Sequence, residues 1–137
     1  MAAKPETRYR LRVEKRLPPG VYHLKLSLPY QGGVADSWYS HGRDLWVEYK
    51  WLEKLPVRVP LDITKGEDPM LSKLQQDWLK DRHAEGRDVA VILGTPKGGI
   101  VFPGVQWLDP IPAKDIEDRL MTVDEVAEWL QQELALV

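Results

Sequence analysis

A chain of 137 residues without cysteine has the length of one ordinary domain and excludes disulfides, thiol catalysis and thiolate metal sites. Apolar residues make up 43% and charged residues 29% of the sequence, the mixture of a globular protein that buries its own core. No apolar run approaches the roughly 18 residues of a membrane span, and the N-terminal residues lack the apolar stretch of a signal peptide, so we expect a cytoplasmic protein with no membrane partner.

The net charge of −2 conceals a separation of charge along the chain. Residues 1–16 contain six Lys or Arg against two Glu, a local charge of +4. Residues 109–137 contain eight Asp or Glu against two basic residues, a local charge of −6. The N-terminal segment can therefore attract phosphate although the chain as a whole is weakly acidic.

The first part of the chain predicts a helix followed by three strands. Residues 5–16 have a helix-favouring composition with proline at the first position, and the Pro-Pro-Gly run that follows ends the segment. Residues 21–28 alternate apolar and polar side chains, as in a half-buried strand. Residues 34–40 and 44–51 flank a three-residue connection that contains Gly42, which predicts a β-hairpin.

A proline- and glycine-bearing excursion and a second helix come next. We expect residues 53–69 to be ordered but irregular, because prolines and glycines interrupt them. Residues 70–86 place Leu71, Leu74 and Trp78 on one helical stripe, and the glycine that closes this segment predicts the helix end.

The last part of the chain predicts two strands and a helix. Residues 88–93 form a short buried strand by their β-branched content, and residues 100–102 form its hairpin partner after a Gly-Gly turn. Thr122 and Glu125 have the spacing of a capping box at the start of an amphipathic helix. The order of helix, three strands, helix, strands and helix predicts an α/β fold with a central mixed sheet flanked by helices.

The predicted hairpin brings two carboxylates together. If the turn is centred on Gly42, Asp36 faces Glu48 across the two strands, and Lys50 shares the face of Glu48 because side chains alternate along a strand. Opposed carboxylates disfavour a sheet unless a divalent cation lies between them, and Mg²⁺ is usually bound by one or two carboxylates with phosphate oxygens and water. An isolated Glu-x-Lys on a strand is most often structural.

Four stretches, in chain order, resemble the PD-(D/E)xK nuclease superfamily. They are similar within it to the VRR-NUC (virus-type replication-repair nuclease) group, which is related to Holliday junction resolvases. Glu6 lies on a helix near the start, and residues 33–36 stand where the family has G-x-P-D, with Ala35 in place of proline. Residues 46–50 match the E-x-K strand, and residues 71–75 match the L-S-x-x-Q start of a helix.

The resemblance, which runs from about residue 4 to residue 93, implies a restriction-endonuclease-like α/β/α core and hydrolysis of DNA phosphodiesters with Mg²⁺ or Mn²⁺. It implies that Lys50 orients the attacking water and that Gln75 steadies Lys50 or a phosphate. The implied catalytic residues are Asp36, Glu48, Lys50 and Gln75. The implied metal ligands are Glu6, Asp36, Glu48 and the main-chain carbonyl of Tyr49.

Basic residues in three places are expected to grip the DNA backbone, which would make binding weaken with salt. They lie on the first helix, at the hairpin tip and in the irregular excursion, and are Arg8, Arg12, Arg43, Lys54 and Arg58. Trp38 and Trp46 either wall the site or stack on an unpaired base, with core packing as the more ordinary role. The three histidines show no zinc-binding spacing, and we treat them as non-ligands.

These observations give one principal hypothesis and two alternatives. We expect a nuclease core at residues 1–103 and an extension at residues 104–137 whose helix packs on the core or on a dimer partner. By analogy with the group, the substrate is branched or four-way junction DNA, cut by a homodimer in a bacterial or phage-infected cell. The alternatives are a flap or end-directed nuclease of phage replication or recombination, and a non-catalytic DNA-binding or assembly module.

Overall fold

The computed structural model describes residues 3–27 and 32–135. Leu28, the last residue of the predicted strand 21–28, lies outside the described residues. The elements follow one another as α1 (Pro5–Glu14), β1 (Tyr22–Lys25), β2 (Ser37–Ser40), β3 (Asp44–Trp51), α2 (Lys73–Ala84), β4 (Val89–Thr95), β5 (Gly98–Pro103), the 3-10 turns η1 (Gln106–Leu108) and η2 (Ala113–Asp115), α3 (Ile116–Arg119) and α4 (Val123–Glu133).

The strands form one five-stranded sheet in the order β1-β2-β3-β4-β5. Strands β3 and β4 are parallel, and the other neighbours are antiparallel. The connection between the two parallel strands carries α2, as a parallel crossover requires. The predicted α/β fold with a mixed sheet flanked by helices is therefore confirmed.

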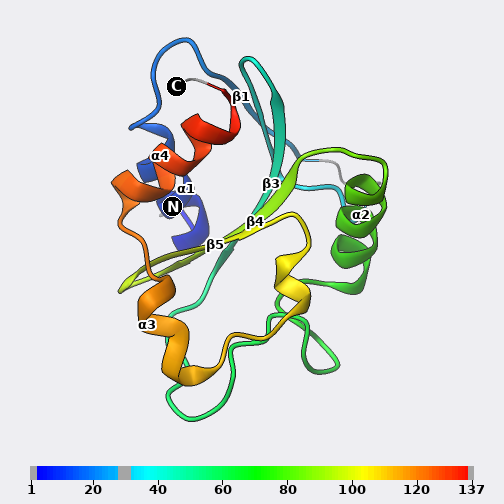
Figure 1. Cartoon of the computed structure of the whole chain (residues 1–137), viewed down its shortest axis with the longest axis vertical. Helices are drawn as coiled ribbons and strands as arrows, with labels where there is room; N and C mark the ends of the chain where they lie inside the picture. The colour runs from blue at the N-terminus through cyan, green and yellow to red at the C-terminus, as the bar shows by residue number, and fades with distance from the viewer. Residues whose placement is uncertain (1–2, 28–31, 136–137) are drawn as a thin grey trace.

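Helices α1 and α4 cover one face of the sheet, on the left of Figure 1. They contribute Tyr9, Val13, Val126 and Leu130 to a buried cluster that includes Val47 of β3. The predicted capping box at the start of α4 is confirmed, because the Thr122 side chain accepts from the Glu125 backbone and the Glu125 side chain accepts in return. This cap fixes where the helix begins, and its apolar face then lies on α1 and the sheet.

Helix α2 covers the opposite face, on the right of Figure 1. Its Leu79 joins Trp107 of η1 and Ile116 of α3 in a second buried cluster with Val91 and Leu93 of β4. Strand β4 is thus buried on both sides, which explains its nearly continuous apolar sequence. Among the described residues, no helix is long and apolar enough to cross a membrane.

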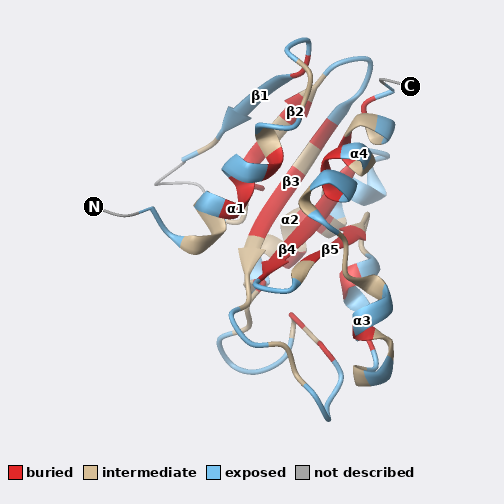
Figure 2. Ribbon diagram, turned by 90° about the vertical axis from the view of Figure 1, so that its left-hand side faces the viewer, coloured by how far each residue is buried: buried red, intermediate tan, exposed pale blue. Residues whose placement is uncertain are grey.

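Two details of burial differ from the sequence prediction. All four residues of β1 are exposed (Figure 2), so the expected half-buried strand is wrong in its burial. The reason is position, because β1 is the edge strand and pairs only with β2. In α2, Leu74 is 63% exposed, whereas Gln76 and Leu79 are buried. The Ser72 capping box starts the helix at Lys73, three residues later than predicted, so Leu71 precedes the helix. The buried side of the helix is formed by Gln76 and Leu79, and Leu74 lies outside it.

Candidate active site

The hairpin register sets the geometry of the site. Trp38 lies opposite Trp46, as predicted from a turn at Gly42, and the ladder continues to the pair formed by Ser37 and Val47. It ends there, one position before the expected cross-strand pair of Asp36 with Glu48. Asp36 therefore lies just before the first residue of β2, outside the ladder that β2 forms with β3.

Glu48 lies on the face of β3 that α2 covers and is 5% exposed. Its Oε2 atom has two partners: the Lys50 ammonium at 3.4 Å and the Gln75 side-chain amide, which donates over 3.1 Å. Within the part of the chain that the structure describes, the other carboxylate oxygen, Oε1, has neither an ion pair nor a hydrogen bond. Glu48 is thus held at one oxygen and free to bind a ligand at the other.

Asp36 is fixed from both neighbouring strands. Its Oδ1 accepts from the Ser37 hydroxyl at 3.1 Å and from the Tyr49 backbone N–H at 3.4 Å. Its Oδ2 lies 3.7 Å from the ammonium of Lys25 on β1. Because Tyr49 directly follows Glu48, the contact with its N–H places the Asp36 carboxylate beside the Glu48 segment of β3.

Burial and like charge act together on the two carboxyls. Burial raises the pKa of Asp36, against the opposing charge of Lys25. Burial, the larger cause, and the negative charge of Asp36 together raise the pKa of Glu48 to about 8, although the positive charge of Lys50 lowers it. The negative charge of Asp36 therefore disfavours the ionised form of Glu48. A divalent cation bound between them would remove that repulsion.

Glu6 lies in the first turn of α1 and is partly buried. Its charge contributes to the raised pKa of both Asp36 and Glu48, so it lies within electrostatic reach of the pair. Across residues 3–27 and 32–135, however, no group of three or more His, Cys, Asp or Glu side chains is arranged to hold a metal ion. The structure thus brings Asp36 and Glu48 together and leaves Glu6 nearby.

The backbone of Tyr49 contacts Asp36, whereas its side chain points to the face of the sheet that α1 covers. Its N–H holds Asp36, while its ring is buried on the α1 face, where its hydroxyl lies 2.8 Å from that of Tyr39. Tyr39 also donates to Glu14, which accepts from Arg10. This network occupies Glu14, the other acidic residue of α1, on the face opposite Glu48.

The donor set fits Mg²⁺ or Mn²⁺. It consists of carboxylate oxygens with the Tyr49 carbonyl close by in the chain, and it contains no histidine or thiolate. Such hard oxygen ligands with an adjacent lysine suit an oxygen-seeking divalent ion better than zinc.

Gln75 lies at the site but makes a different contact from the one predicted. It was expected to steady Lys50 or a phosphate, whereas its amide nitrogen donates to Glu48 and its amide oxygen accepts from the Ser72 backbone. Because the capping box of α2 fixes this side chain, the helix start orients Glu48. Sequence reasoning also missed Lys25, which could have been found by pairing the strand 21–28 with the strand 34–40.

The basic residues expected to bind DNA are distributed over three exposed places. Arg8 and Arg12 lie on α1, where Arg12 stands over the Tyr9 ring at 5.7 Å. Lys54 and Arg58 follow the end of β3 that carries Lys50. Arg43 lies at the hairpin tip, beyond the other end of β3 and about 23 Å from Lys50 along the extended strand.

The tryptophans serve mainly in packing. Trp38 stacks on Trp46 with ring centroids 5.8 Å apart, and Trp46 meets Trp78 of α2 edge-on at 5.7 Å. Trp46 also packs against the buried cluster on that face. These contacts support packing as the role of Trp38 and Trp46.

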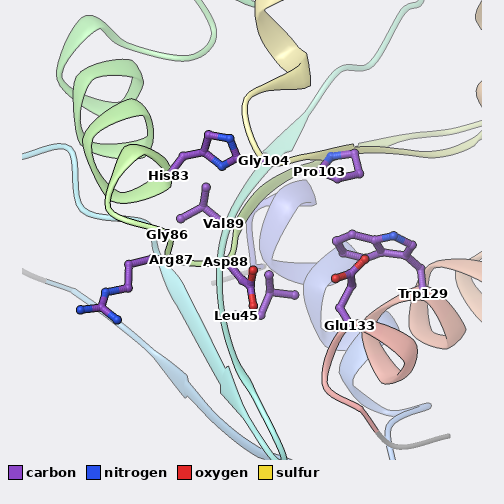
Figure 3. Close-up of a pocket in the computed structure, with 10 residues that line it drawn as sticks. All are labelled: Leu45, His83, Gly86, Arg87, Asp88, Val89, Pro103, Gly104, Trp129 and Glu133. Carbon is purple, nitrogen blue, oxygen red and sulfur yellow. The ribbon is translucent and has the colours of Figure 1, made fainter.

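A separate cavity of about 240 Å³ lies between α2 and α4 (Figure 3). Leu45 and Val89, near the N-terminal ends of β3 and β4, form its floor, with His83 on one side and Trp129 and Glu133 on the other. Asp36, Glu48 and Lys50 are not among its lining residues. This cavity is thus distinct from the carboxylate site.

Comparison with known proteins gives a structural likeness only. No family model matches the sequence, and no curated protein matches it. Among solved structures, the chain is similar to Archaeoglobus fulgidus Hjc, a Holliday junction resolvase from an archaeal hyperthermophile, with a TM-score of 0.54 and 21% sequence identity. The match covers 89% of this chain and 99% of that chain. Residues 4–93 make up only about two thirds of the chain, so part of the C-terminal region is also covered.

Proposed function

We propose that this chain is a metal-dependent endonuclease that hydrolyses phosphodiester bonds of DNA, with branched or four-way junction DNA as its substrate. The observation that carries the proposal is the pairing of the half-buried Asp36 with the buried Glu48, two carboxylates of like charge, with the Lys50 ammonium 3.4 Å from Glu48. Two carboxylates placed together repel each other and do not stabilise the fold unless a cation binds between them. The likeness to Hjc supports a junction substrate by analogy of fold.

Each side chain has a distinct part in the proposed reaction. Asp36 and Glu48 would hold Mg²⁺ or Mn²⁺ with the Tyr49 carbonyl, and Glu6 is the further ligand we propose. When bound, the ion would polarise the scissile phosphate and lower the pKa of a bound water. Lys50 donates to the attacking water and to a phosphoryl oxygen, where negative charge increases in the transition state. Gln75 keeps the Glu48 carboxylate oriented for this task.

The surrounding charge supports a polyanionic substrate. Lys54 and Arg58 extend the positive charge beyond Lys50, and Arg8 and Arg12 add to it on α1. We propose these four, with Arg43 at the hairpin tip, as contacts to backbone phosphates. We further propose that the chain belongs to the VRR-NUC group and acts as a homodimer, because a four-way junction offers two symmetry-related strands.

The test is cleavage of labelled four-way junction, flap and linear duplex DNA by the purified protein in Mg²⁺ and in Mn²⁺. We expect symmetric nicks in the junction, and loss of cleavage with Asp36→Asn and Lys50→Ala while DNA binding stays within a few-fold. Glu85→Gln and Lys97→Ala, which change exposed residues outside the site, serve as matched controls. Cleavage of flaps or ends alone would favour the flap nuclease, and no cleavage of any substrate would favour the non-catalytic DNA-binding module.

A further inference from the structure

The loop that follows β3 carries exposed apolar side chains that the fold does not use. Val57 is 82% exposed and Val59 is 55% exposed, and Arg58 between them is also exposed. Pro56 and Pro60 bracket these three residues. We call residues 56–60 the tip of this loop.

The loop is fixed at both ends, so the tip stands on a rigid base. The Leu52 backbone N–H donates to the Gly94 carbonyl at 2.9 Å. At the other end, Leu61 and Ile111 exchange two backbone hydrogen bonds of 2.8 and 3.0 Å, and the Leu61 side chain is buried. The bracketing prolines restrict the backbone further. A ligand would therefore meet apolar side chains that need little ordering on binding.

The position of the tip relates it to the proposed active site. Figure 2 shows the chain leaving the arrowhead of β3 and extending away from the sheet. Lys50 lies at that end of β3, and Val57 follows it by seven residues, which span at most about 23 Å of extended chain. A DNA arm that is bound at Lys50 and continues past this end of the sheet would therefore reach the tip.

The charge beside the tip favours a phosphate-bearing partner. Lys54 and Arg58 are exposed, and in the described ranges 3–27 and 32–135 neither has a carboxylate within the 4.0 Å that defines an ion pair. Of the nearby acidic side chains, Glu53 accepts a hydrogen bond from the Trp51 indole, and Asp62 accepts two from Thr64. Lys54 precedes the two exposed valines and Arg58 lies between them. Apolar side chains combined with basic residues in this way are typical of wedges in DNA-binding proteins.

We infer that the tip is a wedge that packs Val57 and Val59 against the end base pair of a helical arm at a DNA branch point, while Lys54 and Arg58 hold the adjacent phosphates. This inference rests on the proposed function and names the origin of its substrate selectivity. In continuous duplex, a wedge must first unstack two base pairs, which costs free energy. At a branch point, the end base pair can present an open face, so the same contact is made without that cost.

The test uses binding rather than cleavage. A four-way junction and a linear duplex each carry 2-aminopurine beside the branch position, and binding is measured in EDTA so that the DNA stays uncut. The variant Val57→Ser/Val59→Ser removes the apolar surface, and its exposed positions keep the fold intact. Leu108→Ser, at a residue that is 46% exposed on η1, is the matched control.

We expect junction binding by the wild type to change the 2-aminopurine emission, and the double variant to lose most of that change. Its preference for junction over linear duplex falls roughly tenfold, since several buried methyl groups are lost. Leu108→Ser behaves as the wild type. Lys54→Ala/Arg58→Ala weakens binding to both DNAs and lowers the salt dependence by about two phosphate contacts.

Other outcomes would overturn the wedge. Equal emission changes and equal junction preference in wild type and double variant would do so, as would an absence of DNA binding. A wild-type dimer that dissociates in the double variant would make the tip a protein contact instead. If the wild type cuts no DNA but the emission change depends on the two valines, the wedge stands and the nuclease proposal fails.

Discussion

The Asp36 and Glu48 carboxyls predict a stability that falls as pH rises and is restored by a divalent ion. In the metal-free protein, burial and Asp36 raise the pKa of Glu48 from 4.5 to about 8. Between these values the unfolded chain has lost the Glu48 proton and the folded protein keeps it. The folded state therefore binds more protons, and the free energy of unfolding falls as pH rises. The pKa of Asp36 is also raised, so Asp36 likewise lowers the free energy of unfolding as pH rises.

The variant Glu48→Gln isolates this effect. A rise in pKa from 4.5 to about 8 corresponds to a loss on the order of 5 kcal/mol from low to high pH. Glutamine carries no proton to lose, so the variant should be the more stable protein above about pH 8 in EDTA. In Mg²⁺ the difference in stability should shift back toward the wild type. An ion at 100 times its Kd stabilises the wild type by about 2.7 kcal/mol, whereas the variant has lost one ligand and should gain less.

Urea unfolding followed by tryptophan fluorescence measures both effects, at about pH 5 and about pH 9, with EDTA or Mg²⁺. Glu85→Gln, at an exposed position on the end of α2, should reproduce the wild-type profile. The reasoning is refuted if wild type and Glu48→Gln lose the same free energy of unfolding between the two pH values. Equal stabilisation of both proteins by Mg²⁺ would refute the ligand assignment.

Three further predictions concern neighbouring features. Gln75→Ala removes the amide that orients Glu48 and half of a capping box, so titration calorimetry should show Mg²⁺ binding weakened by about tenfold and urea unfolding a loss of about 1 kcal/mol. Gly33→Ala should destabilise the fold by more than about 1 kcal/mol, because the backbone has a φ of +90° and the added Cβ would lie 2.5 Å from the Leu74 carbonyl oxygen. Arg8→Ala/Arg12→Ala should weaken binding to all DNAs alike and reduce the salt slope by up to about 2 in a fluorescence anisotropy titration.

The first control concerns Gly33→Ala, and the other two predictions each have a result that would contradict them. Gly66→Ala introduces the same kind of backbone strain at a φ of +95° but meets no atom within 4 Å, so it should cost less than Gly33→Ala. A wild-type Mg²⁺ affinity in Gln75→Ala would show that the amide does not orient Glu48. If Arg8→Ala/Arg12→Ala leaves the salt slope unchanged, α1 is not part of the DNA surface.

Local patterns predicted the hairpin and the starts of α1 and α4. A short glycine-bearing turn fixes the pairing of the residues on both sides of it, so the register through Trp38 and Trp46 could be predicted. Alternation along β3 then placed Glu48 and Lys50 on one face. The capping box at Thr122 fixed the start of α4 in the same way. These features involve residues close in sequence, whose geometry depends little on the rest of the chain.

Other parts of the site depended on segments far apart in sequence. Lys25 reaches Asp36 because β1 pairs with β2, and the amide of Gln75 reaches Glu48 because α2 packs over β3. The alternation in residues 21–28 predicted a strand but not its place at the sheet edge, which left it exposed. Strand order and helix docking decide such contacts, and no local period encodes them.

The sequence by itself determined that an acid, a second acid and a lysine would gather around one hairpin, since turn chemistry and the two-residue period of a strand act locally. Only the tertiary structure decided how these groups are held and which charges surround them. It buried Glu48 against α2, left Asp36 half-buried, supplied Lys25 and Gln75 from separate elements, and left Val57 and Val59 exposed beyond the end of β3. The physical reason is that burial and charge coupling depend on packing between elements, which the order of residues along one strand does not specify.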